Sequence, residues 1–220
     1  GLHFHLGSPV FELEPYTKAM EIVLNFAEES NLDISEISPG GGFAIAYTRD
    51  QKPPAVKEYA EAITSALKGR ENLQLIIEPG RSIIGRSGIA IYSIGSSKDI
   101  PGIRKYVSVD GGMGDNIRPA LYQAEYEAVI ANKLHGDIAE KVSIAGKFCE
   151  SGDILLRDVM FPMLEAGDIL AIPAAGAYAP SMASNYNMVP RPAVVMVNDG
   201  KSRVIRRRET YDDMMIYDLV

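Results

Sequence analysis

The chain has 220 residues, of which 46% are apolar, and 29 acidic against 22 basic side chains give a net charge of −7. The apolar share is enough for a sizeable core and excludes a disordered chain. The negative charge argues against a nucleic-acid partner, and no apolar stretch approaches the roughly 20 residues of a membrane span. A single cysteine without a signal pattern predicts a reducing, cytoplasmic setting.

The first part of the chain alternates predicted strands with predicted helices. Apolar residues at helical spacing, among them Ile22 and Phe26, mark the first helix. Such alternation predicts parallel strands joined by right-handed crossovers. A complete (β/α)8 barrel takes about 250 residues, so we interpret this part as the C-terminal portion of a barrel whose front half is absent. The predicted strands cover residues 1–6, 34–38 and 73–77, and the predicted helices cover 15–30 and 55–67.

The remaining chain is rich in short β runs separated by glycine and aspartate turns. It predicts an all-β domain, a sandwich or a barrel. The fold class is therefore α/β plus all-β, with domains at 1–86 and 87–220. The basic run at 203–208 alternates with Val204 and Ile205, which favours a solvated strand. The other predicted strands cover 89–94, 106–109, 142–146, 169–172 and 194–197.

Two motifs follow predicted strands in the first part. The glycines at 40–42 let a phosphate approach successive backbone amides, although a plain flexible loop is an equal alternative. In Glu78-Pro79-Gly80-Arg81, Arg81 could clamp a phosphate or carboxylate, and Glu78 could hold a proton on a heterocyclic nitrogen. When this motif is considered alone, an ion pair between Glu78 and Arg81 at a turn is the favoured interpretation. His3 and His5 lack further metal ligands nearby, so we expect no metal site.

Three more candidates lie in the β-rich part. Arg118 and Tyr122 follow a glycine-rich turn and suit a substrate carboxylate, or else form a surface turn. Tyr178 could bind an anion through its hydroxyl or pack in the core. Cys149, followed by Glu150, could be a buried small residue, a reactive thiol, or half of a site completed elsewhere. Together these groups suit a pyridoxal phosphate enzyme.

The order of the motifs carries a resemblance. The sequences HLGS, GGGF, EPGRS, DGGM, CESGD and GAY, in this order, resemble the diaminopimelate decarboxylases, which are fold-type III enzymes with pyridoxal 5'-phosphate as cofactor. The resemblance covers essentially the whole chain. It implies an alanine-racemase-like barrel portion and the decarboxylation of meso-2,6-diaminopimelate to L-lysine and CO2.

The resemblance also implies roles toward the cofactor. The glycine amides and the Tyr178 hydroxyl would hold the phosphate, His5 would stack on the ring, and Glu78 would pair with the pyridine nitrogen. Ser38-Pro39 departs from the family, which usually has an aspartate before the glycines. The residues implied in cofactor binding are His5, Ser8, Gly41, Gly42, Glu78, Pro79, Gly80, Arg81 and Tyr178.

Toward the substrate, the resemblance implies that Cys149 donates a proton to the carbon that has lost CO2. Glu150 would contact the distal amino end of the substrate. Cys149 and Glu150 would reach the site of a partner subunit, which implies an obligate homodimer. The residues implied in substrate binding are Arg81, Arg118, Tyr122, Glu150 and Tyr178.

The lysine that anchors the cofactor in this family precedes the histidine motif, and nothing here matches its setting; Lys133 lies in the β-rich part. We therefore expect this chain alone to be inactive. Alternatives are a decarboxylase of ornithine, arginine or carboxynorspermidine, and a non-catalytic binding module on the same scaffold. A relative of alanine racemase is disfavoured, because the tyrosine acid/base of that family is not recognisable.

Overall fold

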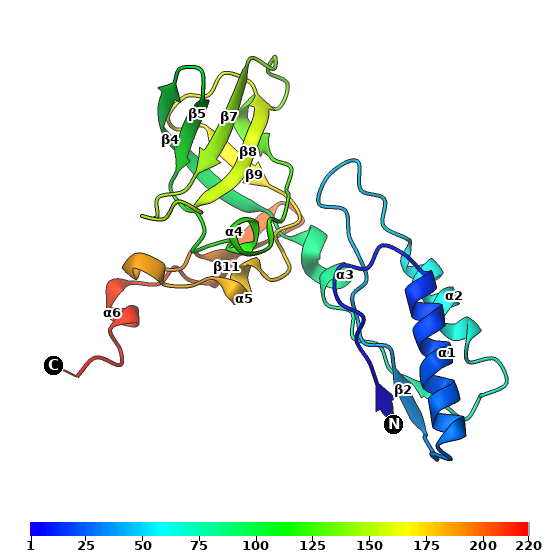
Figure 1. The fold of residues 1–220 in the computed structure, drawn as a ribbon. Helices are drawn as coiled ribbons and strands as arrows, with labels where there is room; N and C mark the ends of the chain where they lie inside the picture. Colours follow the sequence, from blue (N-terminus) through cyan, green and yellow to red (C-terminus); the bar gives the residue numbers. More distant parts are fainter. Residues whose placement is uncertain (220) are drawn as a thin grey trace. The chain divides into compact units, whose positions relative to one another are not determined.

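The computed structural model describes residues 1–219, which divide into two compact units. The first unit comprises Gly1–Gly88 and a later segment, Ala174–Ala177. The second comprises Ile89–Pro173 and the described residues from Tyr178 onward. Figure 1 shows that the first unit carries the longest helix, whereas the second is built mainly of strands. The predicted fold class, an α/β part followed by an all-β part, is confirmed.

The first unit contains a parallel three-stranded sheet in the order β1-β2-β3. The parallel pairing is as the alternation of elements predicted. The strands are shorter than the predicted runs, but the ladder continues beyond them: Phe4 N donates to Ser38 O at 2.9 Å, and Ile76 N donates to Ile37 O at 3.0 Å. The three strands are β1 (Leu2–His3), β2 (Glu36–Ser38) and β3 (Gln74–Leu75).

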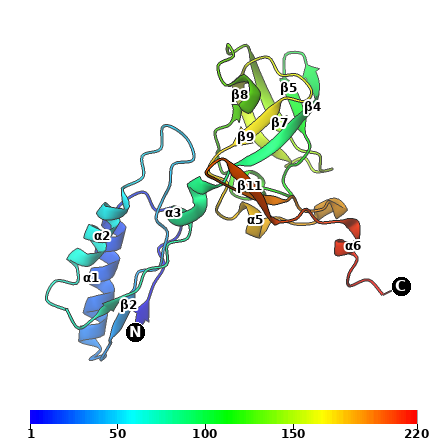
Figure 2. The ribbon, with the colours of Figure 1, turned by 180° about the vertical axis from the view of Figure 1, so that it is seen from behind.

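Two helices, α1 (Glu14–Glu29) and α2 (Val56–Ser65), lie side by side in both views (Figure 1 and Figure 2). Both helices were predicted, but two of the apolar residues whose spacing marked α1 lie outside the core. Ile22 and Phe26 are 60% and 54% exposed. A second apolar stripe at helical spacing is buried instead, and it packs with α2 and β2. The shared core consists of Tyr16, Met20, Leu24, Ile37, Phe43, Tyr59 and Ile63.

The second unit contains a curved six-stranded sheet in the order β6-β9-β4-β5-β7-β8 (Figure 1). Only the β5–β7 pair is parallel within it. Alternate residues of the strands point into the core, as Tyr92 and Ile94 of β4 do. The strands are β4 (Ala90–Ile100), β5 (Arg104–Val109), β6 (Val129–Ile130), β7 (Glu140–Ala145), β8 (Ile154–Phe161) and β9 (Ile169–Ile172).

A two-stranded antiparallel hairpin, β10 (Val194–Asn198) with β11 (Lys201–Arg206), follows the sheet. Strand β11 contains most of the basic run, so the prediction of a solvated strand there is confirmed. Short helical turns complete both units, and several of them carry candidate site residues. They are α3 (Arg81–Ile84), η1 (Gly85–Ser87), α4 (Arg118–Tyr122), η2 (Ala131–Lys133), α5 (Ala179–Met182), η3 (Tyr186–Met188) and α6 (Tyr211–Met214).

Candidate active site

The glycine loop after β2 is held against two other backbone segments. A Cβ on Gly41 would lie 2.1 Å from the carbonyl oxygen of Glu78, and one on Gly42 would lie 2.3 Å from that of Gly7. The φ angle of Gly42 is +93°, which disfavours any side chain. The buried Tyr16 hydroxyl donates to Gly41 O at 2.7 Å. Only glycine therefore fits at these two positions.

His5 adjoins this loop. Its Nδ1 faces the backbone N–H of Gly41 at 3.5 Å, the long limit of a hydrogen bond. A stronger acceptor, such as a phosphate oxygen, can take over this N–H. Ser38 supports the loop, because its Oγ accepts from Gly40 N at 3.2 Å.

Glu78 follows β3 and is connected to both neighbouring strands. Ser38 Oγ donates to Glu78 Oε1 at 3.4 Å, and His3 Nε2 lies 3.2 Å from the same oxygen. The side chain of Glu78 remains 53% exposed. The carboxylate is therefore oriented by His3 and Ser38 but still open to a further hydrogen-bond donor.

Arg81, at the start of α3, is only 6% exposed. Its Nε and Nη2 donate to Ser8 Oγ at 3.2 and 3.1 Å, and its Nη1 donates to the Tyr47 hydroxyl. Ser8 and Arg81, both expected near the cofactor phosphate, are in direct contact. Tyr47 was missed, because nothing in the sequence around it suggests a site.

In the second unit, Arg118 is buried between two tyrosine rings. Its guanidinium carbon lies 5.7 Å from the ring centre of Tyr126 and 5.8 Å from that of Tyr178. Tyr178 has φ +69°, a conformation that costs a bulky residue roughly 1–3 kcal/mol. Such strain persists only where surrounding contacts impose it. Tyr122, on the same short helix as Arg118, is 61% exposed.

The loop that carries Cys149 is tied to the glycine-rich turn by Asp153, which is 3% exposed. Its Oδ1 accepts from Met113 N at 2.6 Å, and its Oδ2 accepts from Phe148 N at 2.8 Å. Burial raises the pKa of Asp153, although these two hydrogen bonds oppose the shift. Cys149 itself is exposed, so the alternative of a buried core cysteine is wrong.

Glu150 borders a hollow of about 320 Å³ in the second unit. The Tyr186 hydroxyl donates to Glu150 Oε2 at 3.4 Å, and the Tyr186 ring stacks on Phe148 with centroids 6.0 Å apart. Tyr186 was missed as a site residue, although its place next to Asn185 in a loop rich in polar residues is a weak signal. The hollow is lined by Met113, Ile117, Glu150, Ser184 and Tyr186.

Residues 1–219 contain neither a cluster of three potential metal ligands nor a helix long and apolar enough to cross a membrane. The polar side chains in the first unit supply an imidazole, a hydroxyl, a guanidinium and a carboxylate around a glycine loop. That donor set suits a phosphorylated heterocycle, because cations and amides bind phosphate while a carboxylate stabilises a protonated ring nitrogen.

The family profile described as "Pyridoxal-dependent decarboxylase, C-terminal sheet domain" matches residues 37–176. The chain belongs to the pyridoxal-dependent decarboxylase family. Within it, the chain is 46% identical to the diaminopimelate decarboxylase of Bacillus subtilis, over all of this chain and 52% of that protein. Identity to the diaminopimelate decarboxylase of Synechocystis is 45%, over 99% of this chain and 48% of that protein.

A crystal structure of diaminopimelate decarboxylase from M. jannaschii in complex with L-lysine is also similar. It superposes with a TM-score of 0.92 at 36% identity, covering 100% of this chain and 52% of that one. The chain thus spans about half the length of these relatives. The family and the donor set agree on the same cofactor, pyridoxal phosphate.

Proposed function

We propose that the protein to which these residues belong decarboxylates meso-2,6-diaminopimelate to L-lysine and CO2. The relatives at 45–46% identity bear the name of that activity. The observation that carries the substrate choice is the hollow bordered by Glu150, where this carboxylate is available to a cationic amino group at the far end of a substrate.

The first unit would hold pyridoxal phosphate, which when bound takes up the electrons released as CO2 leaves. The amides of Gly41 and Gly42, with Ser8 and the Tyr178 hydroxyl, would bind the phosphate. His5 would pack against the ring. Glu78, oriented by Ser38 and His3, would keep a proton on the ring nitrogen. Pro79 and Gly80 would set the turn that brings Glu78 and Arg81 to the same strand end.

The remaining residues would act on the substrate. Arg118, with Tyr122 and Tyr178, would bind a carboxylate, because a buried guanidinium recognises a planar anion in bidentate fashion. Arg81 would lie between phosphate and substrate. The Cys149 thiol would deliver a proton to the carbon that has lost CO2, after which product can leave.

We also infer the setting of the whole protein. Residues 1–86 would be the C-terminal part of a (β/α)8 barrel and residues 87–220 a β domain. Two copies would form a homodimer in which Cys149 and Glu150 complete the partner's site. One exposed, unpaired cysteine suits the reducing cytoplasm.

The proposal is tested by measuring CO2 release from meso-diaminopimelate, ornithine and arginine with the full-length protein. We expect turnover of meso-diaminopimelate, with Cys149→Ala reducing turnover far more than cofactor binding. Turnover of ornithine or arginine, without turnover of meso-diaminopimelate, would show that the proposed substrate is wrong. No turnover of any of them, with cofactor still bound, would favour a binding module.

A further inference from the structure

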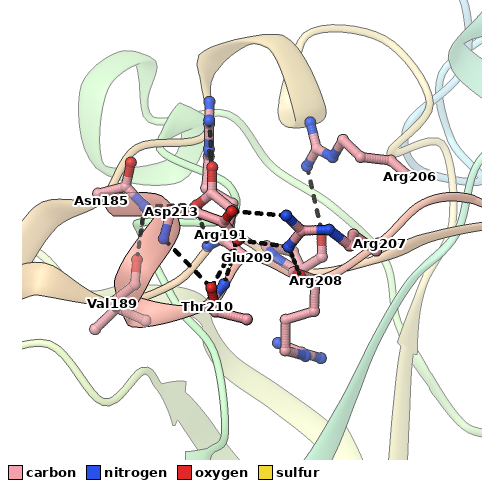
Figure 3. Close-up of polar contacts among 10 residues, drawn as sticks. Asn185, Val189, Arg191, Arg206, Arg207, Arg208, Glu209, Thr210 and Asp213 are labelled. Atoms are coloured by element: carbon pink, nitrogen blue, oxygen red, sulfur yellow. Dashed lines mark hydrogen bonds and ion pairs between the residues drawn. The ribbon is translucent and has the colours of Figure 1, made fainter. Parts of the chain in front are cut away.

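Glu209 joins two segments of the second unit that lie 18 to 24 residues apart in the sequence. Its Oε2 accepts from Asn185 Nδ2 at 2.7 Å and from Arg191 N at 2.8 Å. Its Oε1 accepts from Arg191 Nε at 2.6 Å. Figure 3 shows Asn185 and Arg191 converging on Glu209. Both carboxylate oxygens are thus committed to the segment before β10.

The Glu209 carboxyl is ionised at neutral pH. Its side chain is 19% exposed, and hydrogen bonding to Arg191 lowers the pKa of this carboxyl to about 2. Glu209 and Arg191 therefore form an ion pair at neutral pH, and hydrogen bonds between charged groups are stronger than neutral ones.

The two residues held by Glu209 bracket the short turn η3. This turn contains two residues in the left-handed region, Asn187 with φ +53° and Met188 with φ +57°. Such a backbone needs outside contacts to persist. Asn185 supplies one, because its Nδ2 also donates to Val189 O at 3.1 Å. Glu209 thus fixes both ends of a turn that is strained by itself.

Tyr186 is the first residue of that turn, and it faces the hollow. Its ring stacks on Phe148, and its hydroxyl donates to Glu150. These contacts bracket Cys149 in the sequence. Glu209 is therefore connected to Glu150 by its hydrogen bond to Asn185, by the backbone of the turn, and by the hydrogen bond from Tyr186 to Glu150.

We propose that Glu209 is a positioning residue, which holds Tyr186 against Glu150 and thereby sets the affinity for the far end of the substrate. The inference rests on the proposed function for the identity of the substrate, but the structural link can be tested without it. A residue of the C-terminal segment would in this way control substrate recognition.

Asp213 provides a matched control. It also pairs with an arginine, Arg207, at 2.6 Å, and it also loses one negative charge on substitution. Its other bonds are to Thr210, within its own turn (Figure 3). Glu209→Ala and Asp213→Ala therefore make the same change in charge, but only the first releases the turn that carries Tyr186.

In the full-length enzyme, we expect Glu209→Ala to raise KM for meso-diaminopimelate about tenfold, the effect of one hydrogen bond to a charged group. The kcat should change much less, because Asp153 holds the loop of Cys149 independently of Glu209, through Phe148 N. Glu209→Gln keeps an acceptor oxygen and should restore part of the affinity. Asp213→Ala should leave KM unchanged. A rise in KM for both variants, or a fall in kcat alone, would overturn the proposal.

Tyr186→Phe tests whether Glu209 acts through the Tyr186 hydroxyl or through a general disturbance of the second unit. It removes the hydroxyl but keeps the ring on Phe148, and it should reproduce most of the rise in KM. Adding Glu209→Ala to it should then produce little further loss, since interacting residues are not additive. Fully additive losses would show that Glu209 does not act through Tyr186.

Hydrogen exchange provides a readout that does not depend on activity. Peptides covering residues 184–191 should exchange faster in Glu209→Ala than in wild type, and should be unchanged in Asp213→Ala. Unchanged exchange in Glu209→Ala would overturn the link. If wild type fails to turn over meso-diaminopimelate while exchange responds as expected, the proposed function fails and the link between Glu209 and the turn stands.

Discussion

At the scale of single residues, the ionisation of Glu209 has a consequence for stability. Its pKa lies at about 2 in the folded protein, below its ordinary value of 4.5. A carboxyl with a lowered pKa contributes stability that is complete above the unfolded pKa and is lost as pH falls toward the folded one. We expect the free energy of unfolding to fall between pH 4.5 and pH 2, and to fall less steeply in Glu209→Gln.

Chemical denaturation across this pH range measures the effect. Asp213 also has a pKa below its ordinary value, because Arg207 binds it, so the Glu209→Gln variant keeps part of the slope. A slope identical to that of wild type would show that the Arg191 pair does not persist in solution.

Tyr16 is the second residue with a specific prediction. Burial raises its pKa to about 12, so its hydroxyl remains a donor to Gly41 O at any physiological pH. Tyr16→Phe should lower the free energy of unfolding by about 1 kcal/mol, the usual value of such a bond. It should also weaken pyridoxal phosphate binding, because the glycine loop loses a support.

Urea unfolding and a cofactor titration by absorbance test this pair of effects. Tyr217→Phe is the control, since that side chain is 91% exposed. Weakened cofactor binding without any loss of stability would mean that Tyr16 acts on the cofactor by another route.

At the scale of elements, Asp153 determines how the loop before β8 meets the glycine-rich turn. Asp153→Asn leaves one acceptor oxygen for two backbone amides, so one amide loses its partner, at a cost of about 1–3 kcal/mol. The activity of the Asp153→Asn enzyme should fall as well, because one of the two amides belongs to Phe148, which precedes Cys149 in the chain. Thermal unfolding and CO2 release measure the two effects.

Asp158→Asn is the matched control in the same hairpin. Asp158 is paired with Arg104 at the surface, and its φ of +53° is one that asparagine tolerates well. The variant should therefore be nearly as stable and as active as wild type. Equal losses in both variants would contradict the role given to Asp153.

Helices, parallel strands and the motif residues at strand ends could be predicted because each depends on local spacing. Strand β8 was missed because it follows CESGD directly and Asp158 interrupts its alternation with a left-handed residue. The partners of the motif residues could not be predicted. Tyr16 and Gly41, or Tyr186 and Glu150, are 25 and 36 residues apart, and only the tertiary fold brings them together.

At the scale of the whole molecule, the proposed dimer can be tested by mixing inactive variants. Arg81 lies in the first unit and Cys149 in the second. If each site takes Arg81 from one subunit and Cys149 from the other, mixing Arg81→Ala with Cys149→Ala should restore up to about a quarter of wild-type activity. Random exchange makes about half of the dimers mixed, each with one intact site.

The control is a mixture of Cys149→Ala with Glu150→Ala. These residues would be supplied by the same subunit, so no mixed dimer has an intact site and activity should stay absent. Failure of the first mixture to recover activity, with subunit exchange confirmed by mass, would place each complete site within one chain.

The short segment Ala174–Ala177 bears on how this chain can be divided. It leaves the β-rich unit to join the first one, where Ala175 N donates to Gly88 O at 2.9 Å and Gly176 N donates to Gly85 O at 3.0 Å. A Cβ on Gly176 would lie 2.1 Å from the Ile84 carbonyl oxygen. If the chain were cut after Gly88, the fragment that begins at Ile89 would therefore keep Ala174–Ala177 but lose the backbone groups of Gly85 and Gly88 to which they hydrogen bond. Neither unit is one continuous segment of the chain, which passes between the units after Gly88, after Pro173 and after Ala177. Recombination or domain grafting within this family should therefore keep Ala174–Ala177 together with the first unit.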